Sequence, residues 1–496
     1  MVCGTSSNSG KSLLVAGLCR WLARSGVSVA PFKGQNMSLN SVVTAEGAEI
    51  GRAQGTQAAA ARIEPEVEMN PVLLKPTSDR RSQVVVMGRP WRVLDAAAFQ
   101  KAKPELRETV LGALASLRER FDVVVLEGAG SPAEINLLEG DLVNLGLADA
   151  AGVPAIVVGD IDRGGVFAHL FGTVELLPPA LRRRVRGFVI NKLRGDPALL
   201  GDGPDQLTAR TGVPVLGVVP WLEGIAIDAE DSLALGIGWS SARDGEGEAL
   251  DVAVVRLPRI SNFTDVDALG AEAGVSLRWV ERRSQLGDPD LIVVPGSKST
   301  VADLRWLRER GLADALGSVR NSGRGTVVLG ICGGYQMLGR RIVDRDGVES
   351  PGVVDGLCLL EVETTFEVEK LTALRSGRER ETGRPVRGYE IHHGRVAAGG
   401  GSRPWFELEG PKGLDPEGVA DPARGIFATS LHGVLENDEV RAGLLAEVAK
   451  RRGRQWSPSG ISFAEVREAQ LDRVADACER HLDLDALWRI TAEAAS

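Results

Sequence analysis

Short runs of β-branched and aliphatic residues recur along this chain and alternate with longer stretches of helical periodicity. The runs lie at 123–126, 155–158, 185–190, 213–219, 252–257, 291–294 and 326–329. Because they are apolar on both faces, they predict parallel strands buried between helices. The helical stretches lie at 13–23, 104–118, 302–310 and 440–451. This order predicts an α/β fold built on doubly wound parallel sheets.

The length of the chain predicts more than one domain. Its 496 residues are about three times the common domain size. A polar, glycine-rich stretch at 240–248 separates the two groups of strands and marks a boundary. We therefore expect a first domain over 1–240, a second over 251–440, and a helical extension over 441–496 packed on the second. The segment 375–387, dense in Arg, Glu and Gly, indicates a surface loop.

The composition excludes several classes of protein. With 43% hydrophobic and 25% charged residues, the chain is typical of soluble globular proteins. A net charge of −9, with both signs interspersed, argues against a nucleic-acid partner. The five cysteines form no CxxC pair, so we expect no disulfide framework or zinc site, and a reducing cytoplasm fits best. No apolar run approaches the roughly 20 residues of a membrane span, and we expect neither a leader nor a membrane partner.

The N-terminus resembles a phosphate-binding loop, Gly4-Thr-Ser-Ser-Asn-Ser-Gly-Lys-Ser12, followed by an amphipathic helix. Backbone N–H groups at such a helix start bind phosphates, the lysine reaches the β and γ oxygens of ATP, and the serine holds Mg²⁺. Five residues separate the glycines where the usual loop has four, so a glycine–serine turn is the alternative. Candidate ATP-binding residues are Gly4, Thr5, Asn8, Ser9, Gly10, Lys11 and Ser12.

Carboxylates follow two of the predicted strands. Glu127 comes directly after the run 123–126, and Asp160 and Asp162 follow the run 155–158. Parallel sheets bind ligands at the carboxyl ends of their strands, and phosphoryl transfer needs carboxylates for Mg²⁺. Glu127 is therefore a candidate metal ligand, and the two aspartates are candidates for magnesium or substrate contact. Solvated loop acids are the alternative.

A cysteine lies on a predicted strand-to-helix turn, in Gly330-Ile-Cys332-Gly-Gly-Tyr-Gln-Met-Leu338. Glycines on both sides allow a strained turn that exposes a nucleophile, and the helix N-terminus favours the thiolate. A buried structural cysteine would not need these glycines. The turn Pro295-Gly-Ser-Lys-Ser299 follows another strand and can present N–H groups to a tetrahedral intermediate. Candidate oxyanion-hole residues are Gly296, Ser297 and Gly333.

A cysteine nucleophile needs a base, and the chain has five histidines. His432 follows a short apolar run downstream of Cys332, where a loop can bring it to the thiol. We take it as the candidate base. His392 and His393, in Gly388-Tyr-Glu-Ile-His-His-Gly-Arg395, orient glutamine, bind the larger substrate or line a polar surface. The remaining two lie on predicted helices, where packing is the expected role.

With both sites identified, the chain resembles the cobyric acid synthases, glutamine amidotransferases of the cobalamin pathway, over nearly its whole length. The phosphate-binding loop is similar to the long variant of dethiobiotin synthetase. The segments that carry the resemblance are 33–40, 69–76, 160–167, 388–392 and 430–433. The resemblance implies a dethiobiotin synthetase-like parallel-sheet domain followed by a class I glutamine amidotransferase-like α/β domain.

The resemblance also implies roles for residues. Cys332 would be the nucleophile and His432 its partner, with Tyr389 and His392 orienting substrate or glutamine. Ser12, Glu127 and Glu49 would bind magnesium, with Asp160 a further candidate, while Lys11 and Lys33 would face phosphate. His432 is followed by Gly433-Val-Leu-Glu436 and not by the usual His-x-Glu. A Cys–His dyad is therefore implied, and whether Glu436 or another acid substitutes is open.

The implied reaction uses ATP, Mg²⁺ and L-glutamine to amidate a corrinoid. Its product is adenosylcobyric acid, made from adenosylcobyrinic acid a,c-diamide at four carboxylates (b, d, e, g) through acyl phosphates. One rival is cobyrinic acid a,c-diamide synthase, against which the segment Gln35-Asn-Met-Ser argues. Another is a partitioning-type ATPase whose second domain is noncatalytic, but such a domain needs no cysteine at a strained turn.

Overall fold

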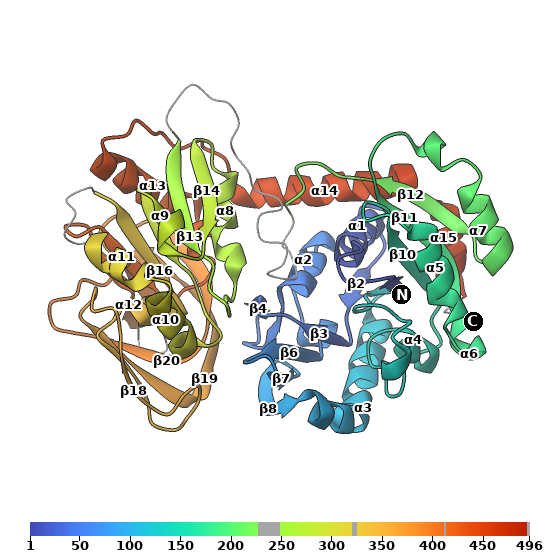
Figure 1. Cartoon of the computed structure of the whole chain (residues 1–496), viewed down its shortest axis with the longest axis horizontal. Helices are drawn as coiled ribbons and strands as arrows, with labels where there is room; N and C mark the ends of the chain where they lie inside the picture. The colour runs from blue at the N-terminus through green and yellow to red at the C-terminus, as the bar shows by residue number, and fades with distance from the viewer. Residues whose placement is uncertain (227–248, 320–324, 411–412, 494–496) are drawn as a thin grey trace. The chain divides into compact units, whose positions relative to one another are not determined.

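The chain forms two compact units in the computed structural model, which describes residues 1–226, 249–319, 325–410 and 413–493 (Figure 1). Unit 1 comprises Met1–Ser38, the described chain from Ile50 to the first gap, and the chain from Arg467 onward. Unit 2 comprises Leu39–Glu49 and the described chain from 249 to Val466. The boundary predicted at 240–248 lies outside the described residues.

Unit 1 is built on a parallel sheet, as the apolar runs predict. β1, β10, β11 and β12 pair in that order, β2 pairs with β9, and a bridge between Val2 and Glu127 joins β9 to β1. All these pairings are parallel. The strands are β1 (Val2–Gly4), β2 (Val29–Phe32), β9 (Val123–Leu126), β10 (Ala155–Asp160), β11 (Val185–Leu193) and β12 (Val215–Pro220).

Helices and a small second sheet complete unit 1. β3, β6, β7 and β8 form that sheet, with β6, β7 and β8 antiparallel. The remaining elements are α1 (Lys11–Arg24), β3 (Gln35–Met37), α2 (Arg52–Ala60), β6 (Val72–Pro76), β7 (Arg81–Val86), β8 (Arg89–Asp95), α3 (Ala96–Arg120), α4 (Leu145–Ala150), α5 (Val166–Glu175), α6 (Pro179–Arg182) and α7 (Gly203–Thr211).

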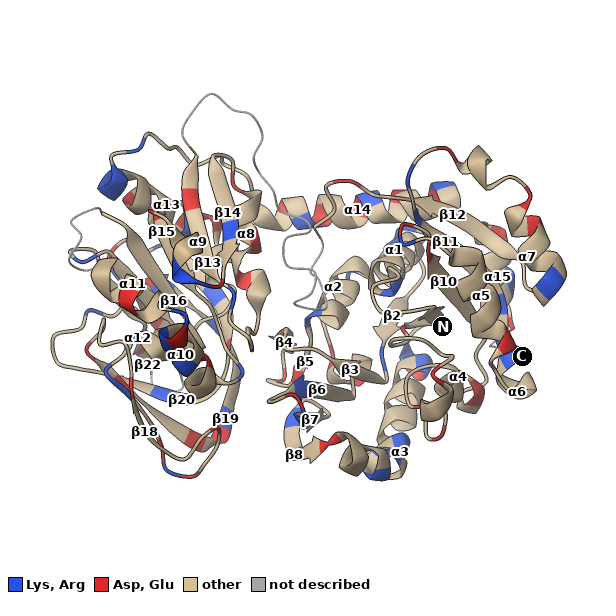
Figure 2. Cartoon of the chain, viewed as in Figure 1, with Lys and Arg blue, Asp and Glu red and all other residues tan. Residues whose placement is uncertain are grey.

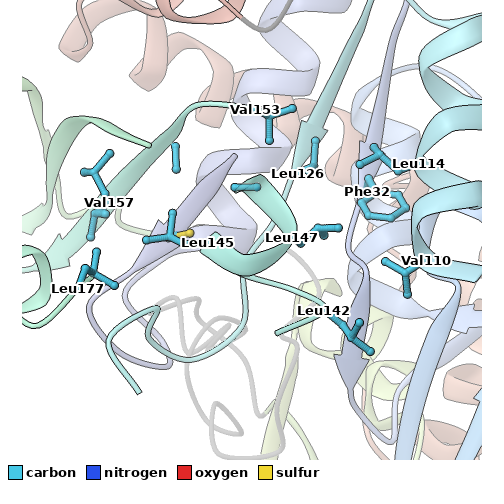
Figure 3. Packing of buried hydrophobic residues seen from close by; sticks show 14 of the residues in the cluster. Phe32, Val110, Leu114, Leu126, Leu142, Leu145, Leu147, Val153, Val157 and Leu177 are labelled. Atoms are coloured by element: carbon cyan, nitrogen blue, oxygen red, sulfur yellow. The ribbon is translucent and has the colours of Figure 1, made fainter. Parts of the chain in front are cut away.

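One of the buried clusters of unit 1 joins the sheet to α3, and another joins the sheet to α1 and the C-terminal helices. The buried residues of α3 include Leu106, Val110, Leu114 and Leu117, which recur every three or four positions and so form one apolar face. This face belongs to the same buried cluster as Phe32 of β2, and Figure 3 shows Val110, Leu114 and Phe32 side by side. Burying such a face stabilises a helix far more than its intrinsic propensity does.

The C-terminal helices differ from the prediction. α13 (Asp438–Arg452) belongs to unit 2, but most of α14 (Phe463–His481) and all of α15 (Leu484–Ala492) belong to unit 1 and not to the predicted amidotransferase extension. Arg20 of α1 is buried and forms an ion pair of 2.7 Å with Asp472 of α14. Leu471, Ala475 and Cys478 of α14 join the apolar cluster of α1. Acidic and basic residues alternate along α14 (Figure 2), which obscured its apolar face in the sequence.

Unit 2 contains a second α/β sheet of strand order β14-β13-β15-β16-β24-β23. All pairings are parallel except that of β23 with β24. The elements of this layer are β13 (Leu250–Val255), α8 (Asp267–Ala271), β14 (Val275–Val280), α9 (Arg283–Leu286), β15 (Leu291–Val294), α10 (Thr300–Glu309), α11 (Leu312–Val319), β16 (Val327–Ile331), α12 (Gly333–Leu338), β23 (Val419–Asp421) and β24 (Ile426–Thr429).

A mostly antiparallel sheet is the other part of unit 2. It contains β17 (Arg341–Asp344), β18 (Gly352–Asp355), β19 (Val362–Glu379), β20 (Pro385–Ala398), β21 (Phe406–Gly410) and β22 (Gly413–Glu417). β19 and β20 form a long hairpin, so the predicted loop at 375–387 is wrong except for its turn. Cross-strand ion pairs such as Arg375 with Glu390, at 2.5 Å, explain why strands this polar are stable.

No helix in the described part of the chain is long and apolar enough to span a membrane.

Candidate functional site

Cys332 lies at the predicted strand-to-helix turn. β16 ends at Ile331, α12 begins at Gly333, and Cys332 between them has a φ of 50° in the left-handed region. Such a backbone is strained for a residue with a side chain, and it is typical of functional turns. A Cβ atom on Gly334 would overlap the carbonyl oxygen of Val294. The flanking glycine is therefore required by the close packing of this turn against β15.

His432 lies beside the Cys332 thiol, as predicted. It follows β24, the strand next to β16, and its ring hydrogen-bonds the Cys332 side chain. On the other side of the ring, the Nδ1 atom of His432 lies 2.7 Å from Oδ2 of Asp265. Burial opposes a charged imidazole, but the Asp265 carboxylate and Cys332 together raise the pKa of His432 to about 10. The site thus favours the imidazolium form of His432 beside the Cys332 side chain.

Asp265 is the residue that sequence reasoning missed. Its Oδ1 accepts a hydrogen bond of 2.9 Å from the backbone N–H of Gly433, so its carboxylate holds both the ring and the backbone of the histidine segment. It lies in the 3₁₀ turn Phe263–Val266, which follows β13 at the carboxyl end of the sheet. Because it is only 1% exposed, its interaction with the ring is little screened. The expected dyad therefore has a third member, and it is not Glu436.

The predicted oxyanion-hole residues surround the same turn. A Cβ on Gly333 would lie 2.8 Å from the backbone nitrogen of Ser297, so the two backbones pass close together. A Cβ on Gly296 would lie 3.1 Å from Cε1 of His432. The Ser297 hydroxyl is bound to the Asp303 carboxylate at 2.6 Å, which leaves the backbone as the part of Ser297 suited to an oxyanion.

Tyr389 and His392 differ in their distance from the nucleophile. Tyr389 stacks on the His432 ring with centroids 5.4 Å apart, and the two backbones are hydrogen-bonded to each other. The Nε2 atom of His392 lies 3.2 Å from Oε1 of Glu390, while its buried Nδ1 has no hydrogen-bond partner. Tyr389 therefore contacts the candidate base directly, and roles of Tyr389 and His392 in orienting substrate or glutamine stay predictions.

The phosphate-binding loop in unit 1 connects β1 to α1. The Lys11 ammonium donates to the carbonyl oxygens of Ser6 at 2.9 Å and Gly130 at 3.2 Å, so it is held between two loops. Gly10 has a φ of 100° and lies so close to Asn191 that a Cβ there would overlap the amide. Asn191 donates to the Ser9 carbonyl at 2.9 Å. These contacts fix the shape of the loop.

Glu127 is bound to the residues expected to serve the nucleotide. Its carboxylate accepts from Ser12 at 2.8 Å and Lys33 at 3.0 Å, and Gln57 also donates to it. Burial opposes ionisation of Glu127, but Lys33 and the hydrogen bonds from Gln57 and Ser12 hold its pKa below the usual value. The structure thus brings together four groups that suit a magnesium–phosphate complex, and Gln57 was not predicted.

The other candidate acids have different partners. Lys192 binds Oδ2 of Asp160 at 2.7 Å and also the Asn8 carbonyl, so Asp160 contacts the phosphate-binding loop through this lysine. Asp162 pairs with Arg194 at 2.6 Å in an exposed position. Glu49 belongs to unit 2 and forms a buried ion pair with Lys370. Magnesium binding by Asp160 or Glu49 stays a prediction.

The donor set around Glu127 fits magnesium. Among the residues that the structure describes, no group of three or more His, Cys, Asp or Glu side chains can hold a metal. Mg²⁺ usually takes one or two protein oxygens and completes its shell with phosphates and water. Glu127 and Ser12 offer two such oxygens beside the phosphate-binding loop.

Comparison with known proteins defines the class. Residues 1–234 match the CobQ/CobB/MinD/ParA nucleotide binding domain, and residues 251–440 match the CobB/CobQ-like glutamine amidotransferase domain. A nucleotide-binding domain and a glutamine amidotransferase domain in one chain define an ATP-binding amidotransferase.

Full-length relatives define the family. A cobyric acid synthase of Nocardia farcinica is 54% identical, covering 100% of this chain and 97% of the relative. The cobyric acid synthase of Rhodococcus jostii is 54% identical and covers 98% of this chain and 94% of the relative. That of Streptomyces coelicolor is 51% identical and covers 99% of this chain and 95% of the relative. The chain belongs to the cobyric acid synthase family, which consists of glutamine-hydrolysing ligases of cobalamin biosynthesis.

Proposed function

We propose that the chain amidates four carboxylates (b, d, e, g) of adenosylcobyrinic acid a,c-diamide to form adenosylcobyric acid. It uses ATP to activate each carboxylate and glutamine to supply ammonia. The observation that carries the proposal is the buried Cys332–His432–Asp265 arrangement in a chain 54% identical to a cobyric acid synthase over its whole length. A glutaminase needs this nucleophile and base, whereas a noncatalytic domain does not.

Unit 2 would release the ammonia. The Cys332 thiolate attacks the side-chain amide carbon of glutamine, and backbone N–H groups of Ser297 and Gly333 receive the oxyanion. The His432 imidazolium donates its proton to the departing ammonia, and the glutamyl thioester forms. Water, deprotonated by His432, then hydrolyses the thioester to glutamate and restores the thiol. Asp265 holds the ring in the orientation that both proton transfers need.

Unit 1 would activate the corrinoid carboxylate. This carboxylate attacks the γ-phosphorus of ATP, ADP leaves, and ammonia displaces phosphate from the acyl phosphate to form the amide. Lys11 neutralises charge on the β and γ oxygens, while Lys33 holds the Glu127 carboxylate ionised. Ser12 and Glu127 would hold Mg²⁺, which supplies further neutralisation of phosphate charge. We place the reaction in the cytoplasm, where the Cys332 thiol stays reduced.

Replacement of Asp265 by asparagine is expected to lower kcat/KM for glutamine hydrolysis by about 10²- to 10⁴-fold, the usual contribution of acid–base catalysis. The Asp265 carboxylate raises the pKa of His432, so its loss lowers that pKa. In this variant, the His432 imidazolium loses its proton at a lower pH than in the wild type. The alkaline limb of the pH–rate profile should therefore move to lower pH, which glutamate release measured across pH will show. An unchanged alkaline limb would remove Asp265 from this role.

A product assay tests the proposed substrate. The protein is incubated with ATP, Mg²⁺, glutamine and either adenosylcobyrinic acid a,c-diamide or cobyrinic acid, and added amides are counted by mass. We expect a product with four added amides from the first corrinoid. Two amides added to cobyrinic acid, with none added to the a,c-diamide, would instead make the chain an a,c-diamide synthase. A Cys332→Ala preparation with glutamine controls for contaminating ammonia.

A further inference from the structure

A segment of the N-terminal half packs in unit 2. The chain leaves unit 1 after Ser38 and returns at Ile50, and the residues between them, which we call the Leu39–Glu49 arm, belong to unit 2. The arm lies inside the residues that match the nucleotide-binding family. It contains β4 (Ser41–Val43) and the start of β5 (Glu49–Gly51), and hydrogen bonds between Thr44 and Ala48 close its turn. Its function is not explained by nucleotide binding.

Two asparagines join the arm to the turn that carries Asp265. Oδ1 of Asn40 accepts from the backbone N–H of Phe263 at 3.1 Å. In return, Oδ1 of Asn262 accepts from the backbone N–H of Ser41 at 2.8 Å. Asn40 is 1% exposed and Asn262 is 3% exposed, so water does not replace these bonds. Each asparagine therefore satisfies a buried backbone donor of the other segment.

This pairing fixes the backbone from which Asp265 projects. Asn262 has a φ of 50°, in the left-handed region that Asn adopts more readily than most residues. The N–H of Asp265 donates to the Asn262 carbonyl at 3.0 Å, closing the turn. Asp265 then binds the His432 ring at 2.7 Å. A continuous series of buried hydrogen bonds thus runs from Asn40 through the turn to the base.

The arm also contacts the other side of the base. Val43 forms a buried apolar cluster with Tyr389 and Ile391 of β20, and Tyr389 stacks on the His432 ring. At the end of the arm, Glu49 pairs with Lys370 of β19. The arm is therefore attached to unit 2 at three places: the turn that carries Asp265, Tyr389 of β20, and Lys370 of β19.

We propose that Asn40 is a positioning residue of the glutaminase, acting through the Asn262 turn and Asp265 on His432. The inference rests on the proposed function of Cys332 and His432 as the glutaminase. It explains why a segment of the nucleotide-binding half lies in the amidotransferase unit: without it the third member of the site has no fixed backbone. A displacement of about 1 Å at such a site costs on the order of 10²-fold in rate.

The test compares Asn40→Ala, Asn40→Asp and Glu46→Ala in the full chain. Glu46 lies exposed in the turn of the same arm, so Glu46→Ala is the matched control. Asn40→Ala should lower kcat/KM for glutamine hydrolysis about 10²-fold, shift its alkaline limb to lower pH, and leave ammonia-dependent amidation unchanged. Asn40→Asp keeps the acceptor oxygen and should recover most of the rate. Wild-type hydrolysis by Asn40→Ala would overturn the proposal.

A double-mutant cycle with Asp265→Asn shows whether Asn40 acts through Asp265. If it does, Asn40→Ala has little further effect once Asp265 is replaced, because residues in one network are not additive. Full additivity of the two losses overturns the proposal. The underlying function is tested separately with Cys332→Ala. If this variant still hydrolyses glutamine, the glutaminase assignment is refuted. If Cys332→Ala loses hydrolysis while Asn40→Ala hydrolyses glutamine normally, only the positioning role is refuted.

Discussion

Replacement of Cys332 by alanine is expected to abolish glutamine-dependent amidation and to leave ammonia-dependent amidation near the wild-type rate. No other group in the site can form the glutamyl thioester, so hydrolysis should fall by about 10⁴-fold or more, as when other enzymes lose a nucleophile. The phosphate-binding loop, Glu127 and Lys33 are all in unit 1 and do not depend on the thiol. Amide formation measured with glutamine and with ammonium salt separates the two activities.

The control for this prediction is Cys358→Ala, because Cys358 is an exposed free cysteine whereas Cys332 is buried. It should retain both activities. Equal loss of the glutamine and ammonia reactions in Cys332→Ala would contradict a division into two sites. Since the backbone at Cys332 is strained, a thermal unfolding curve of each variant shows whether the fold persists.

Periodicity predicted the parallel sheets because their strands are buried on both faces. The predicted bounds of Val123–Leu126 and Leu291–Val294 coincide with β9 and β15. A short, uninterrupted apolar run between two helices therefore indicates a buried parallel strand. The β19–β20 hairpin gave no such signal, since cross-strand ion pairs and not apolar side chains support much of it. A pairing between strands is a property of two segments, and one segment alone does not reveal it.

The candidate site was predictable where its chemistry is local. Cys332 was found from adjacent glycines, and the loop at Gly4–Ser12 from its spacing. Asp265 was missed because the family pattern directs attention to the residues after His432, whereas this acid lies 167 positions earlier. A parallel sheet brings the ends of distant strands together, so sequence distance carries no information about such a partner. Asp265 is the first acid after the strand Leu250–Val255, and this position was the available signal.

Replacement of Lys11 by alanine is expected to silence amidation with either nitrogen source. Its ammonium donates hydrogen bonds to the carbonyls of Ser6 and Gly130. When ATP binds, phosphate oxygens would replace these carbonyls as the acceptors. Removing a preorganised hydrogen-bond donor from a group that gains charge in the transition state lowers kcat by about 10²- to 10³-fold. Loss of a charged donor to a transferring phosphoryl group should lower kcat by at least that much. ADP release and amide formation, measured with glutamine and then with ammonia, should both fall.

Glutamine hydrolysis without ATP distinguishes this loss from unfolding, because the Cys332 site is in unit 2 and should persist in Lys11→Ala. Lys101, exposed on α3, supplies the matched control Lys101→Ala, which should keep both activities. Truncating Lys11 also leaves two carbonyls without their donor, at a cost of about 1–3 kcal/mol, so a lowered melting temperature is expected. Amidation that persists at the wild-type rate in Lys11→Ala would remove this lysine from phosphate binding. Loss of amidation with unchanged ATP affinity would instead assign it to the transition state, where charge moves to the β–γ bridge oxygen.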